Sequence, residues 1–93
     1  MSPTGPSTIG QDEIAAEILR LTEQRGPAKS ICPSDVARSL APEESAWRPL
    51  LGKVRLAAVE LARQGRIEVL RKGKPVDPGE EIRGVIRLRI RSR

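Results

Sequence analysis

The chain has 93 residues, of which 38% are hydrophobic and 31% charged, and its formal net charge is +5. These values are typical of one small folded domain and exclude a disordered chain. Because there is no apolar run of 18 residues and no signal-peptide pattern, we expect a cytoplasmic protein with no membrane partner. A single cysteine fits a reducing compartment, and Trp47 as the single aromatic residue requires a core of aliphatic side chains.

The first predicted element is a helix over about residues 9–25. Residues 1–8 before it are rich in Ser, Pro, Thr and Gly, so we expect a disordered tail ahead of a domain that spans 9–93. Thr8 and Gln11 have the spacing of a capping box that would open the helix. The apolar positions that face the core at helical spacing are Ile14, Ile18 and Leu21.

A second, short helix is predicted after a brief extended segment. Residues 29–31 are too few for an independent strand, but they can pair with a later hairpin as a third strand. Residues 32–35, Cys-Pro-Ser-Asp, favour a helix start, and Pro42 requires the helix to stop near Ala41. The inner face of this helix is Val36, Ala37 and Leu40. Residues 42–47 follow as a turn or as one helical turn.

A third, long helix is predicted over the stretch from Arg48 to Arg66, with Pro49 in its first turn and Gly65 closing it. The stripe that faces the core is Leu50, Val54, Ala57 and Leu61. The opposite face carries no acid and consists of Arg48, Gly52, Arg55, Leu56, Val59 and Arg63. An apolar face opposite a basic face fits a recognition helix and also fits a core helix with a solvated side.

Two strands are predicted at the C-terminal end, over residues 66–71 and 85–91, and they should form an antiparallel hairpin. Residues 72–84 between them are rich in Gly and Pro and predict a long loop. In the second strand Ile86, Leu88 and Ile90 should point inward while Arg87, Arg89 and Arg91 point outward. The loop balances Lys72, Lys74 and Arg83 with Asp77, Glu80 and Glu81.

This order of elements predicts an α+β fold of the winged helix-turn-helix type, with three helices and a small antiparallel β-hairpin wing. A set of short segments, spread in order over residues 9–90, carries a resemblance to a known family: Ile31-Cys32-Pro33-Ser34-Asp35-Val36-Ala37-Arg38, Trp47, Val54-Arg55, Gly65-Arg66-Ile67, Lys72-Gly73, Val76-Asp77-Pro78 and Gly84-Val85-Ile86-Arg87-Leu88. On these residues the chain resembles a small bacterial family of winged-helix domains with no assigned function. The resemblance implies the fold and supplies neither a reaction nor a ligand.

Catalysis has few candidate residues. The chain has no His, no Tyr and one Cys, which removes the common general bases and most metal-ligand sets. We therefore expect no enzyme, no cofactor, no metal and no small-molecule substrate. Cys32 lies at a predicted helix N-terminus, which favours a thiolate; a reactive thiol and a partly buried cap residue both remain open.

Charge is divided unevenly along the chain. Residues 1–47 carry four basic and seven acidic residues, whereas residues 48–93 carry thirteen basic and five acidic residues. A strongly basic half favours a polyanion, and a lone aromatic residue disfavours stacking on single strands, so the hypothesis is double-stranded DNA. The candidate contacts are Arg48, Gly52, Lys53, Arg55, Val59, Arg63, Arg66, Lys72, Lys74, Arg87, Arg89 and Arg91.

A module for protein interaction or dimerisation without nucleic-acid binding is the alternative. It would use Trp47, Leu56 and Val59, since aliphatic and Trp side chains suit a protein interface. Trp47 also fits a plug between the second and third helices. Arg55 can be offered to solvent or held by an acid of a neighbouring helix. The acidic loop can fold back to screen the Arg row, or the charge alternation can serve solubility alone.

Overall fold

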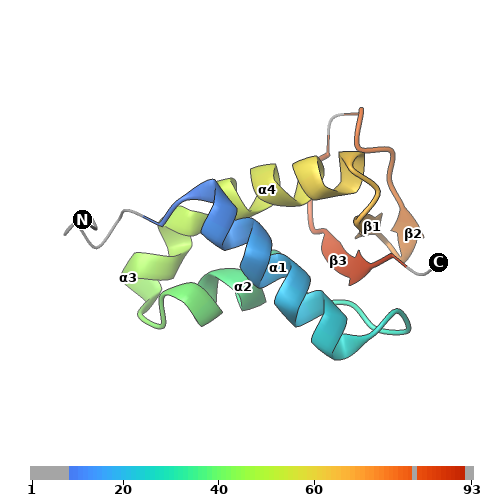
Figure 1. Cartoon of the computed structure of the whole chain (residues 1–93). Coiled ribbons are helices and arrows are strands. Elements are labelled where there is room, and N and C mark those ends of the chain that lie inside the picture. Colours follow the sequence, from blue (N-terminus) through green and yellow to red (C-terminus); the bar gives the residue numbers. More distant parts are fainter. Residues whose placement is uncertain (1–8, 81, 92–93) are drawn as a thin grey trace.

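Three main helices and a small antiparallel sheet form an α+β fold with a winged-helix-like arrangement (Figure 1). The computed structural model describes residues 9–80 and 82–91, so the predicted tail at 1–8 lies outside the described residues. In chain order the elements are α1 (Gln11–Arg25), α2 (Pro33–Leu40), α3 (Glu44–Trp47), the 3-10 turn η1 (Arg48–Leu50), α4 (Leu51–Arg63), β1 (Ile67–Arg71), β2 (Lys74–Pro75) and β3 (Arg87–Ile90).

Helix α1 begins later than predicted. Its N-cap is Gly10, whose backbone N–H donates to Glu13 Oε1 at 3.4 Å. Glu13 therefore supplies the side-chain acceptor that was expected from Gln11 in the predicted capping box. Thr8 lies outside the described residues. The predicted end is confirmed: Gly26 has a φ of 84° and donates its N–H to the Thr22 carbonyl at 3.0 Å.

The second helix and the short extended segment before it are confirmed. Asp35 Oδ2 accepts a hydrogen bond from the Cys32 N–H at 3.1 Å, which satisfies one of the free donors at the start of α2. Residue Ile31 forms a β-bridge with Leu88, with N–H to carbonyl distances of 2.8 and 2.7 Å in the two directions. The chain between α1 and α2 is thereby joined to the far edge of β3.

The predicted single helix from Arg48 is wrong at its N-terminal end. Within the predicted range, Arg48–Leu50 form the 3-10 turn η1, and the α-helix spans Leu51–Arg63. The one-turn helix α3 at Glu44–Trp47 agrees with the helical turn offered for residues 42–47. Pro49 explains the change, since it has no N–H to donate and fits the start of a turn better than a helix interior. At the other end Gly65 has a φ of 77°, which confirms the predicted left-handed closing residue.

The sheet has the strand order β2-β1-β3, with β1 antiparallel to both neighbours. The hairpin of β1 and β3 is confirmed, but the prediction of one uninterrupted loop over 72–84 is wrong. Lys72 and Gly73 both have positive φ, 54° and 81°, as in a type I′ turn, and this turn lets β2 pair with β1. The loop proper therefore starts after Pro75.

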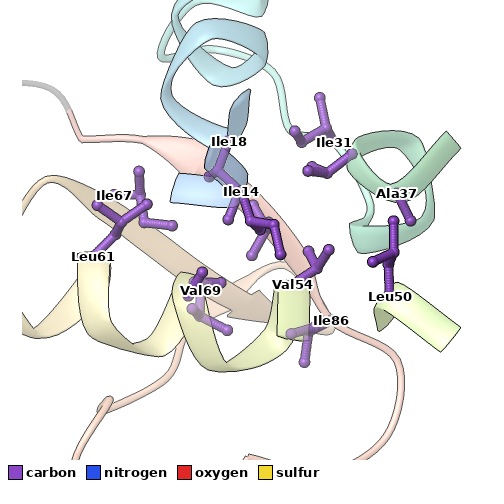
Figure 2. Packing of buried hydrophobic residues seen from close by; sticks show 14 residues of the cluster. Ile14, Ile18, Ile31, Ala37, Leu50, Val54, Leu61, Ile67, Val69 and Ile86 are labelled. Atoms are coloured by element: carbon purple, nitrogen blue, oxygen red, sulfur yellow. The ribbon is translucent and has the colours of Figure 1, made fainter. Parts of the chain in front are cut away.

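The core lies where α1 and α4 pack on the sheet and α2 packs against both helices, and Figure 2 shows the aliphatic side chains of these elements meeting there. The predicted register of β3 is confirmed, because Ile86 and Leu88 are buried while Arg87 is exposed. Predicted core residues Leu21, Leu40 and Ile90 are only half-buried. Instead of Leu21, Thr22 is buried; its hydroxyl donates to the Ile18 carbonyl at 2.7 Å, which removes the cost of burying it.

Glu17 of α1 joins this helix to α2. Arg20 Nη2 lies 2.6 Å from Glu17 Oε2, and the Ser39 hydroxyl of α2 also donates to Glu17. The hydrogen bond from Arg20 lowers the pKa of Glu17, burial of the carboxyl opposes it, and the Ser39 hydrogen bond adds to the lowering. Glu17 therefore contributes stability above the pKa of a Glu in the unfolded chain, and this contribution is lost as pH falls through the folded-state pKa.

Candidate nucleic-acid interface

The outer face of α4 forms one wall of a groove whose other wall is the loop between β2 and β3. The groove has a volume of about 300 Å³. The structure thus brings together five residues of the predicted helix face and four of the segment that follows β2: Gly52, Arg55, Leu56, Val59 and Arg63 with Pro78, Glu80, Ile82 and Ile86. The groove is lined mainly by aliphatic side chains, together with the half-buried Arg55 and the exposed Arg63 and Glu80.

Arg55 is neither offered freely to solvent nor held by a described acid. Its Nη1 donates to the Gly84 carbonyl and its Nη2 to the Ile82 carbonyl, each at 3.0 Å. Backbone carbonyls of a loop outside the sheet need donors, and the guanidinium supplies two in a fixed planar geometry. Arg55 therefore fastens the loop to α4. A pairing across 27 and 29 residues of sequence leaves no local signal in the sequence.

The turn between β1 and β2 carries three exposed cations, Arg71, Lys72 and Lys74, around Gly73. Within the part of the chain that the structure describes, none of the three makes an ion pair or a side-chain hydrogen bond. We name Arg71–Lys74 the basic turn. Arg71 was absent from the predicted contacts, although the run Arg-Lys-Gly-Lys is the signal that marks it.

The predicted Arg row on β3 does point outward, but two of its members are engaged within the fold. Arg87 donates from Nε to the Ser30 hydroxyl at 2.7 Å and from Nη2 to the Ser30 carbonyl at 2.9 Å. Arg89 donates to Glu68 Oε1 from Nη2 at 2.5 Å and from Nε at 3.0 Å, and its side chain is 31% exposed. Arg91 remains exposed. The row is therefore weaker as a phosphate track than its sequence indicates.

Among the other predicted basic contacts, one is engaged in an ion pair and three are exposed without one to any described residue. Arg48 pairs with Glu44, with Nε 2.6 Å from Oε2. In contrast, Lys53, Arg63 and Arg66 are exposed, and no ion pair with another described residue holds them. Lys53 and Arg63 belong to α4, whereas Arg66 precedes β1.

Trp47 is half-buried and packs against the hydrophobic core, in agreement with the predicted plug. Two guanidinium groups lie over its indole, that of Arg38 at 4.9 Å and that of Arg48 at 5.8 Å from the ring centroid. Such cation–π contacts hold both side chains near the ring. The structure does not bring Trp47 into the groove that contains Leu56 and Val59.

Cys32 is half-buried at the N-terminus of α2, and its Sγ lies 3.0 Å from the Ser34 hydroxyl. This contact is local and joins the thiol to the cap of the helix. Across residues 9–80 and 82–91, no group of three or more His, Cys, Asp or Glu side chains is placed to hold a metal ion.

A family model described as a protein of unknown function, DUF3253, matches residues 11–91. The chain belongs to the DUF3253 family. No curated protein matches the chain significantly. No helix of this DUF3253 domain, among the residues described, is long and apolar enough to cross a membrane.

Proposed function

We propose that this DUF3253 domain is a non-enzymatic, bacterial winged-helix module that binds double-stranded DNA through the phosphate backbone. The observation that carries the proposal is the basic turn, where Arg71, Lys72 and Lys74 are exposed and unpaired among the described residues. Unpaired cations on a narrow turn can approach phosphates and release condensed counterions.

The geometry favours phosphate contacts over base reading. An Arg on the outer face of α4 can bond a guanine edge, but two donors of Arg55 already serve the loop carbonyls of Ile82 and Gly84. Glu80 lies on the wall opposite α4, where it would repel a phosphate that approached the helix. The basic turn has no described acid bound to it, so it supplies the main contact, with little preference for sequence.

The test is a fluorescence-anisotropy titration of a random duplex at several salt concentrations. Three phosphate contacts give a slope of log K against log salt of about −2.7, which is about a 40-fold loss of affinity between about 50 and about 200 mM salt. Replacing Lys72 and Lys74 together by Ala should flatten the slope by about 2.

A matched control removes two cations from the other half of the chain. Arg25 and Lys29 are both exposed and lie at and just after the end of α1. Arg25→Ala with Lys29→Ala changes the net charge equally but should leave the slope within about 0.5 of the wild-type value. If no duplex binds at about 50 mM salt, where screening is weak, or if both double variants act alike, the proposal is wrong.

A further inference from the structure

Two large hydrophobic side chains are exposed among the described residues, Leu56 with 67% and Val85 with 86% of their surface accessible. Leu56 lies in the groove between α4 and the loop, beside Val59, Ile82 and Ile86. An exposed Leu on its own is common in folded proteins, but one at the mouth of an aliphatic groove marks a contact surface.

Gly52 supports a close contact at the same groove. It lies in the first turn of α4, and a Cβ built on it would meet nothing within 4 Å. Within the described part of the chain no neighbour therefore requires a glycine here, and glycine is a poorer helix former than alanine. A missing side chain on the groove wall does permit another backbone to approach α4 closely.

The two walls of the groove carry opposite charge. On the α4 side Arg63 is exposed, and on the loop side Glu80 is exposed; neither forms an ion pair with another described residue. A two-fold axis through the groove would bring the basic helix wall of one copy against the acidic loop wall of the other, twice. A surface with both charges on opposite sides is complementary to itself.

We propose that this groove is a self-association surface at which a second copy of the chain packs in a two-fold dimer. Leu56 enters the partner's groove, the α4 helices cross at Gly52, and Arg63 pairs with the partner's Glu80. Since α4 has 13 residues and is about 20 Å long, the contact stays near the lower size limit of specific interfaces, about 1,000 Å² in total. The dimer is therefore weak and depends on concentration.

This inference is independent of DNA binding, because the basic turn is not among the residues that line the groove. Sedimentation velocity of the wild type from about 10 μM to about 1 mM should show a shift from monomer to dimer. Leu56→Glu should weaken association at least about tenfold, since it places an acid in an aliphatic groove. Ala16→Glu adds the same charge at an exposed position of α1 and should leave association unchanged.

Gly52→Ala separates association from folding. The alanine fits the helix without a clash, so thermal unfolding should occur at the same or a higher temperature. The added methyl groups should nevertheless hold the two α4 helices apart and weaken the dimer about tenfold. Association unchanged by Gly52→Ala would contradict the crossing at this residue.

A charge exchange tests the two-fold pairing directly. Arg63→Glu alone and Glu80→Arg alone should each remain monomeric, because like charges then face one another across the axis. Mixed in equal amounts, the two variants should form a heterodimer, since the acid introduced on the helix wall of one variant meets the base introduced on the loop wall of the other. Restoration by the double variant but not by the mixture would mean that Arg63 and Glu80 act within one chain. That result, or a wild type that is monomeric at about 1 mM, would overturn the proposal.

Discussion

The basic turn and the loop that follows it belong to one segment between β1 and β3 yet differ in charge and in contacts. The basic turn holds three exposed cations that no described acid neutralises. The loop holds Asp77, Glu80 and Glu81 in sequence, and Arg55 fastens it to α4 through the Ile82 and Gly84 carbonyls. A segment whose net charge is close to zero thus gathers cations in its first part and acids in its second, and net charge alone conceals this.

Different causes produce the two parts. Positive φ at Lys72 and Gly73 closes a two-residue turn, which keeps the cations on a hairpin built from β1 and β2. The described part of the loop touches the sheet's backbone through one hydrogen bond at its start, from the Val76 N–H to the Val69 carbonyl at 2.8 Å, and beyond it Arg55 holds the loop to α4. The first part is therefore determined locally, while the second depends on the rest of the fold.

The largest effect is expected from reversing charge in the basic turn. Lys72→Glu with Lys74→Glu removes two phosphate contacts and adds two repulsions, so duplex affinity at about 50 mM salt should fall more than about 100-fold. Fluorescence anisotropy measures the affinity, and circular dichroism checks that the fold is retained. If DNA binding survived at wild-type affinity, the basic turn would have no part in it.

Breaking the Arg55 contact should affect the loop and leave the basic turn intact. Arg55→Ala removes two charge-assisted hydrogen bonds from a half-exposed side chain, so unfolding free energy should fall by about 1–3 kcal/mol. Amide exchange should accelerate at residues 82–86, while affinity for DNA stays within about threefold.

The control for this variant is another arginine on the same face of α4. Arg63 is exposed and has no ion pair with a described residue, so Arg63→Ala should change stability by less than about 0.5 kcal/mol. Equal losses for the two variants, measured by urea unfolding, would show that Arg55 does not specifically secure the loop.

This difference also explains how far the sequence predicts the structure. Alternation in β3 and helical spacing in α4 are local patterns, and they predict the burial of Ile86, Leu88 and Val54. The basic turn also has a local signal, because Gly73 adopts positive φ readily, although Lys72 is an uncommon residue type at positive φ. The Gly- and Pro-rich residues that follow made the end of this turn hard to locate in the sequence. Pro49, two residues before α4, likewise gives a local reason for the late start of that helix.

Side-chain partners across the fold were not predictable from such patterns. Arg87 with Ser30 and Arg89 with Glu68 each join residues more than 20 positions apart, and both pairs reduce the number of free cations on β3. The sequence locates these arginines on the outer face of the strand, but it does not reveal which polar groups lie opposite. Candidate sites built from charge alone therefore overestimate the accessible basic surface.

A smaller effect is expected at the glycine of the basic turn. Gly73 has a φ of 81°, so Gly73→Ala should destabilise the protein by about 1 kcal/mol through backbone strain. Gly52 is the control, since it lies in helix α4, its φ is not positive, and a Cβ there meets nothing within 4 Å. Thermal unfolding of both variants checks the difference, and equal stability of Gly73→Ala and wild type would contradict the left-handed turn.

The smallest effect concerns the acid on the loop. Glu80→Gln removes one negative charge next to the outer face of α4, so binding to a random duplex should tighten by about twofold at about 50 mM salt. The gain should vanish at about 200 mM salt, because exposed charges are screened beyond about 7 Å there. Glu23→Gln removes the same charge from an exposed position on α1 and should tighten binding less. If both variants tighten binding equally, only net charge matters, and the loop does not oppose the basic turn.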